Sequence, residues 1–164
     1  MSGMLLGRLE GILSGSAPPF LVLGKFTPSR LHENTIAAEL QEWLTQFGII
    51  RAVNMHGCRM PIGVRNPADN LRIASSDNVV RNWHRDGFGK YPGADYTEMP
   101  ASKWFIFWSN GSSTELCDKD MNVYIFERGD VLLVDNENIQ HRCPPPEENR
   151  WFARLADPIL PTMD

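Results

Sequence analysis

Most of the chain after residue 48 consists of short apolar segments separated by clusters of Gly, Pro, Asn, Asp and Ser. Each segment has the length of a β-strand and is too short to form a stable helix by itself. About eight such strands without intervening helices are typical of a β-sandwich or barrel, and they disfavour a parallel α/β sheet. The expected strands are Ile49–Val53, Leu71–Ala74, Val79–His84, Lys103–Ser109, Met121–Glu127, Val131–Val134, Ile139–Arg142 and Trp151–Leu155.

Residues 1–48 have helical spacing instead. Apolar residues at positions 5, 6, 9, 12 and 13 predict a short first helix, and SGSAPP at 14–19 predicts a loop after it. A second helix is expected between Thr27, a good N-cap followed by Pro28, and Gly48, a good stop signal. Its apolar side chains lie on one stripe and are Ile36, Leu40, Trp43, Leu44 and Phe47.

The expected strand Lys103–Ser109 is apolar on both faces. Successive side chains of a strand alternate between its faces, so Ile106 and Trp108 share one face with Trp104. Phe105 and Phe107 share the other face. We therefore expect one face to look into the β-core and the other to meet the second helix. Alternatively, a second copy of the chain covers that face in a homodimer.

The composition limits the classes of partner. The 164-residue chain has 16 Lys and Arg against 20 Asp and Glu, and its basic residues form no run. Phosphate binding needs clustered Lys and Arg, so no nucleic-acid partner is expected. No segment approaches the roughly 20 apolar residues of a membrane-spanning helix, so no membrane association is expected. The 3 cysteines show no CxxC spacing, which disfavours disulfides and zinc knuckles and favours a reduced, cytoplasmic setting.

His84 and Asp86 form a His-x-Asp pair at the end of an expected strand. Alternate residues of a strand point the same way and lie about 6.6 Å apart, so an imidazole and a carboxylate can reach one cation. By itself this pair is a weak signal, because a surface histidine near an acidic residue has the same pattern.

A second element strengthens the signal. Gly129 and Asp130 lead into a buried strand, and an Asx-rich turn then leads to His141. Two histidines and one carboxylate with open positions form the facial triad that binds iron(II) in non-haem oxygenases. The same ligands can also hold a catalytic zinc ion.

A third element favours iron and a dicarboxylic cosubstrate. Arg150, Phe152 and Arg154 alternate along one expected strand and therefore share a face. Guanidinium groups inside a barrel are costly unless they meet anions. A keto diacid supplies one, because its keto-acid end chelates the metal while its far carboxylate pairs with an arginine.

Several of these segments resemble one known family. NWHRDGF, GSSTELCD, ERGDVLLVDNENIQH and RWFAR are similar to blocks of the taurine dioxygenase-like family of iron(II)/2-oxoglutarate-dependent oxygenases, as is LTQFGIIRAVNMHG at 44–57. The resemblance covers most of the chain from about residue 40. It implies a mainly β fold with N-terminal helices, a double-stranded β-helix or cupin-like jelly roll. We then expect a single domain, 1–164, with a helical segment at 1–48 and the jelly-roll core at 49–158.

The resemblance also implies the chemistry. It assigns the iron(II) ligands to His84, Asp86 and His141. The implied reaction consumes O₂ and 2-oxoglutarate, releases succinate and CO₂, and oxidises a small substrate, most often by hydroxylation. Two alternatives are a cupin-type metalloenzyme that does not use 2-oxoglutarate and a jelly-roll binding module without catalysis.

For the cosubstrate, the resemblance assigns Thr114 and Arg150 to the distal carboxylate of 2-oxoglutarate. Arg154 matches a second arginine, which in some members reaches an anionic group of the substrate. We therefore expect a small anionic or amino-acid-like substrate. Arg150 follows His141 by only nine residues, which is short for the family, so the roles of the two arginines are interchangeable at this point.

The chain also departs from the family in one region. Family members carry a long, partly helical insertion after the threonine strand, whereas here only Glu115–Arg128 separates Thr114 from Gly129. The lid over the substrate is therefore missing or reduced. The segment Phe88–Pro100, which follows the His-x-Asp pair, is the expected replacement.

Overall fold

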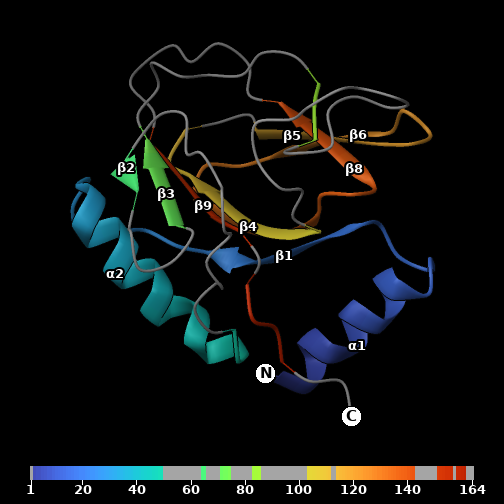
Figure 1. Ribbon diagram of the computed structural model, residues 1–164, viewed down its shortest axis with the longest axis horizontal. Helices are drawn as coiled ribbons and strands as arrows, with labels where there is room; N and C mark the ends of the chain where they lie inside the picture. Colours follow the sequence, from blue (N-terminus) through green and yellow to red (C-terminus); the bar gives the residue numbers. More distant parts are fainter. Residues whose placement is uncertain are drawn as a thin grey trace.

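The computed structural model describes residues 2–49, 64–65, 71–74, 83–85, 103–111, 114–142, 151–156 and 158–161. In this part of the chain, two N-terminal helices accompany two antiparallel sheets (Figure 1). The helices are α1 (Ser2–Leu13) and α2 (Glu33–Leu44), which continues into a 3-10 turn (Thr45–Phe47). The strands are β1 (Phe20–Lys25), β2 (Val64–Arg65), β3 (Leu71–Ala74), β4 (Trp104–Ser109), β5 (Thr114–Asp118), β6 (Val123–Phe126), β7 (Asp130–Asp135), β8 (Ile139–Arg142) and β9 (Phe152–Ala156).

The two sheets face each other. The larger has the order β1-β7-β4-β9-β3-β2, and the smaller has the order β6-β5-β8. One buried apolar cluster joins them, with Phe105 and Leu132 from the larger sheet and Leu116 and Ile139 from the smaller. Two antiparallel sheets packed over a shared core form the architecture of a jelly roll, so the expected fold class is confirmed.

Strand β4 separates this core from a second one. Phe105 and Phe107 belong to the cluster between the sheets, whereas Ile106 and Trp108 belong to a cluster on the other side. That second cluster includes Leu5 and Leu9 of α1 and Ile36, Leu40 and Leu44 of α2. Both helices thus cover the outer face of the larger sheet (Figure 1). The two apolar faces of the strand predicted this position for the second helix, α2.

Helix α2 begins later than its sequence signals predicted. The expected N-cap Thr27 and Pro28 precede the helix, which starts at Glu33 after His32. The Glu39 carboxylate accepts hydrogen bonds from the backbone N–H and hydroxyl of Ser29, which holds this part of the chain outside the helix. His32 caps the helix instead, because its Nδ1 accepts a hydrogen bond from the N–H of Asn34 at 3.2 Å.

The helix stop was correctly predicted. Gly48 ends the 3-10 turn with φ of 73°, a left-handed conformation that favours glycine. No helix in the described part of the chain is long and apolar enough to cross a membrane.

Strand β1 adds a strand to residues 1–48, which were expected to form a helical segment with a loop at 14–19. It pairs with β7 at the edge of the larger sheet, with Phe20 opposite Val134. The register shifts between Val22 and Gly24, where Gly24 has φ of 152°. A Cβ atom on this glycine would lie 3.2 Å from Cζ2 of Trp43, so the bulge brings helix α2 close to the sheet.

Most of the other expected strands are present. The strands expected near residues 71–74, 103–109, 121–127, 131–134, 139–142 and 151–155 correspond to β3, β4, β6, β7, β8 and β9. Strands β2 and β5 were not predicted, and the polar residues of β5 (TELCD) explain why that strand lacked an apolar signal. The strands expected at Ile49–Val53 and Val79–His84 lie mostly outside the described residues.

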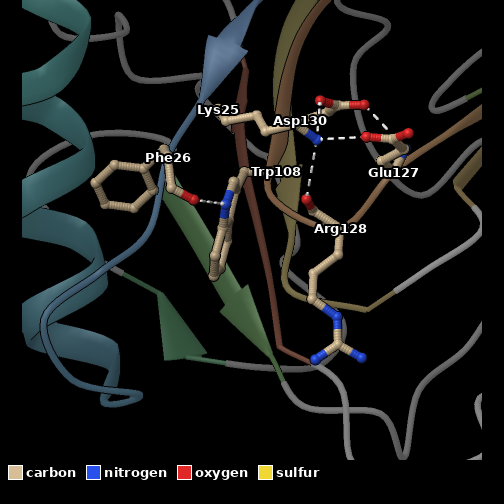
Figure 2. A network of polar contacts seen from close by, with 6 residues as sticks. All are labelled: Lys25, Phe26, Trp108, Glu127, Arg128 and Asp130. Carbon is tan, nitrogen blue, oxygen red and sulfur yellow. Dashed lines mark hydrogen bonds and ion pairs between the residues drawn. The ribbon is translucent and has the colours of Figure 1, made fainter.

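Polar contacts fix the end of β1 on β7 (Figure 2). Nζ of Lys25 lies 2.8 Å from Oε2 of Glu127 and 3.2 Å from Oδ1 of Asp130. On the helix side, Nε1 of the buried Trp108 donates a hydrogen bond of 2.9 Å to the carbonyl oxygen of Phe26, and the two rings pack edge to face. These contacts tie the segment after β1 to the centre of the larger sheet.

Replacing Trp108 with phenylalanine tests this connection. The variant leaves the buried Phe26 carbonyl without its indole donor and leaves space in a packed core, so the free energy of unfolding should fall by about 2 kcal/mol. Urea denaturation followed by far-ultraviolet circular dichroism measures the change. Phe20→Leu, an apolar change at the start of β1 that removes no hydrogen-bond donor, is the comparison. An equal loss in both variants would contradict a role for the indole hydrogen bond.

Candidate metal centre

The structure places two of the predicted metal ligands side by side. His84 and His141 form an antiparallel bridge, in which each backbone N–H donates to the other residue's carbonyl oxygen, at 3.2 and 2.9 Å. Their imidazole centroids are 4.1 Å apart, with an angle of 56° between the ring planes. The segment around His84 therefore lies next to β8, at the edge of the smaller sheet.

Both imidazoles face the space between the sheets. His141 lies opposite Leu116 of β5, which belongs to the cluster between the sheets. The His141 ring also packs edge to face on Phe105 of the opposite sheet, with centroids 5.2 Å apart. Paired residues of neighbouring strands point to the same side, so His84 shares this face. His141 is buried and His84 is half-buried.

This arrangement fits a metal ion. Metal–nitrogen bonds of about 2 Å to neighbouring coordination positions bring two imidazole nitrogens within roughly 3 Å of each other, which suits rings at this separation. Imidazole is a common ligand of both iron and zinc. The third predicted ligand, Asp86, lies outside the described residues, among which no group of three or more His, Cys, Asp or Glu side chains is suitable for a metal.

Two predicted cosubstrate residues face the same interior. Arg154 is 5% exposed, and its Cζ lies 4.9 Å from the centroid of the Phe105 ring. Thr114, the first residue of β5, is also buried and lies two residues before Leu116, on the same face of that strand. Arg150 and the expected lid Phe88–Pro100 lie outside the described residues.

Phe105 connects the histidine pair to Arg154. The Phe105 ring contacts the His141 ring of β8 and the Arg154 guanidinium of β9. The separation between guanidinium and imidazole is therefore no larger than the sum of the two contact distances.

A hydrogen-bonded turn precedes β8. The Asp135 carboxylate accepts hydrogen bonds from the N–H of Glu137 at 3.1 Å and from the side-chain amide of Asn138 at 2.7 Å. Arg85 reaches across from the neighbouring segment and donates from Nη1 to the carbonyl oxygen of Glu137 at 2.8 Å. The turn thus holds both the start of β8 and the residue after His84.

Sequence reasoning missed several residues around the histidines. Phe105 was expected only as core, and Arg85, Glu115 and Arg142 were not singled out. The sequence did contain a signal for Arg85 and Arg142. Each directly follows a predicted histidine ligand, so its side chain points to the opposite face of the strand. Cys117 of β5 follows Leu116 and therefore points away from the space between the sheets. Burial raises the pKa of its thiol.

No protein-family model matches this chain, and no curated protein matches it in sequence. Its fold is similar to solved structures, among them the crystal structure of the non-heme iron oxygenase OrfP in complex with Fe. The two chains share 10% sequence identity with a TM-score of 0.52, over 99% of this chain and 79% of the other. The likeness therefore extends over the whole fold, and this mainly β architecture is one that an iron oxygenase also has.

Proposed function

We propose that this chain is an iron(II)-dependent oxygenase that uses 2-oxoglutarate as its cosubstrate, as in the taurine dioxygenase-like family. The observation that carries the proposal is the pairing of His84 with His141. Their imidazoles come from distant parts of the sequence, have centroids 4.1 Å apart and face the space between the sheets. Asp86, which follows His84 by two residues, would complete the three protein ligands. The similar fold of an iron oxygenase supports this proposal.

Arg154 supports the use of a diacid. Its guanidinium is buried in the same interior and lies against Phe105, which also contacts His141. A buried guanidinium suits a carboxylate, because the two groups form paired, charge-assisted hydrogen bonds. We assign the distal carboxylate of 2-oxoglutarate to Arg154, with the hydroxyl of Thr114 as a further donor. Arg150 is then the second cation, available for a small anionic or amino-acid-like substrate.

The chain's own residues would position the reactants. The two histidines and Asp86 would hold iron(II), which supplies the redox chemistry for O₂ and leaves half of its coordination positions open. Arg154 and Thr114 would orient the cosubstrate so that its keto-acid end faces the histidine pair. Phe105 and the buried residues around it would exclude water from that side of the site.

Adding 2-oxoglutarate to the anaerobic protein loaded with iron(II) tests the proposal. A keto acid that chelates iron(II) gives a visible charge-transfer absorption band, and glutarate, which lacks the keto group, is the matched control without a band. We expect the band with 2-oxoglutarate in the wild-type chain and its loss in Asp86→Ala. Admission of air should then convert 2-oxoglutarate to succinate and CO₂.

The other outcomes identify the alternatives. Bound metal without a band, and without succinate formation, would indicate a cupin-type metalloenzyme that does not use 2-oxoglutarate. A chain that binds no iron(II) at all would indicate a binding module and would overturn the proposal. A screen of small acids and amino acids for faster succinate formation would then define the substrate of an active enzyme.

A further inference from the structure

Three side chains form a row on the outer face of the smaller sheet, directly behind the histidine pair. Glu115 of β5 lies opposite Arg142 of β8, and the Arg142 Nε donates to Oε2 of Glu115 at 2.6 Å. The bridge between His84 and His141 places Trp83 opposite Arg142 on the other side. Cζ of Arg142 lies 4.2 Å from the centroid of the Trp83 ring. Arg142 thus contacts both of its neighbours in the sheet, β5 and the segment that carries His84.

The described part of the segment that carries His84 consists of residues 83–85. Its bridge to His141 is an isolated one in the described part of the chain, with two backbone hydrogen bonds. A slip of one residue would turn His84 to the outer face, because side chains alternate along a strand. Side-chain contacts that join Trp83 to β8 oppose such a slip.

The row has the properties needed to supply those contacts. Glu115 is only 13% exposed in its side chain, and Arg142 is 38% exposed, so solvent screens this ion pair only in part. The planar guanidinium of Arg142 pairs with a carboxylate at its edge and stacks on an aromatic ring with its face. A slip would separate Trp83 from Arg142.

We propose that Trp83, Arg142 and Glu115 are positioning residues that hold His84 in register with His141 and so set the geometry of the two imidazoles. The inference rests on the proposed function for its consequence, which is metal affinity. Its structural content, the register of the bridge, is independent of any metal. The row acts from the outer face and does not contact the interior in which the imidazoles lie.

Cobalt(II) binding to the full chain tests the consequence. Cobalt(II) reports its coordination geometry through visible absorption bands, so one titration gives both a dissociation constant and a spectrum. We expect Arg142→Met and Trp83→Leu each to weaken binding by about 10- to 100-fold, the usual effect of losing a contact that orients a ligand. Trp83→Phe keeps an aromatic face and should restore affinity and spectrum. Lys25→Met, which removes an ion-paired cation from the other sheet, is the matched control.

Amide hydrogen exchange of the metal-free chain tests the register itself. Arg142→Met should accelerate exchange of the His84 and His141 amides, whereas the amides of Leu132 and Leu133 on β7 should be unchanged. Unchanged exchange together with wild-type cobalt affinity in Arg142→Met and Trp83→Leu would overturn the inference and leave the proposed function intact. If wild type binds no metal, the proposed function fails, and the exchange measurement still decides whether the row holds the register.

Discussion

Replacing His141 with alanine is expected to abolish iron(II) binding and all turnover of 2-oxoglutarate. The substitution removes one of three proposed protein ligands, so the loss of affinity should exceed the roughly 100-fold that loss of a supporting contact causes. His141 is also buried, and its ring contacts those of Phe105 and His84. Anaerobic titration with iron(II), followed by metal analysis after gel filtration, measures the binding.

His32→Ala is the control for this prediction. His32 caps helix α2 through a hydrogen bond to the N–H of Asn34 and belongs to the helix layer. Its loss should lower stability by about 1 kcal/mol, as for other N-caps, without changing iron(II) affinity. Equal metal binding by wild type and His141→Ala, with both chains folded, would remove His141 from the ligand set.

Arg154→Met should weaken 2-oxoglutarate binding by about 100-fold, or roughly 3 kcal/mol, while iron(II) still binds. The cosubstrate would lose the ion pair at its distal carboxylate but keep its keto-acid end on the metal. Methionine fills irregular apolar space, so it should continue to pack against Phe105. The charge-transfer band, titrated with 2-oxoglutarate under anaerobic conditions, gives the apparent Kd.

Two comparisons make this result specific. Arg8→Met removes an exposed arginine from helix α1, which packs on the outer face of the larger sheet (Figure 1), and should leave the apparent Kd unchanged. Arg150→Met tests the other arginine of the pair. A 100-fold loss in Arg150→Met with no change in Arg154→Met would exchange the two roles and assign Arg154 to the substrate instead.

The sequence predicted much of the fold because its strongest signals are local. The alternation of apolar residues in 103–109 depends only on neighbouring positions, and β4 has the two buried faces that this pattern predicted. Strand β1 was missed although its first four residues, FLVL, form a short apolar run after the loop at 14–19. A run of this length does not by itself distinguish a strand from a helix. Pairing with β7, a strand far along the chain, places these residues in the sheet.

Local signals also competed at helix α2. Thr27 and Pro28 have good intrinsic preferences for a helix start, yet the helix begins at Glu33. The contacts of Ser29 with Glu39, two turns into the helix, stabilise a loop in their place. A capping preference is worth about 1 kcal/mol, which is small enough for such contacts to override.

For the candidate site, the sequence by itself determined which residue types are available and in what order. His84, His141 and Arg154 stand at positions whose strand parity directs their side chains inward, because alternation is a property of the strand alone. Only the tertiary structure decided that His84 lies opposite His141, that Phe105 contacts both His141 and Arg154, and that Arg142 contacts both Trp83 and Glu115. These are contacts between segments far apart in the chain, and their register depends on how the two sheets and the helix layer pack together.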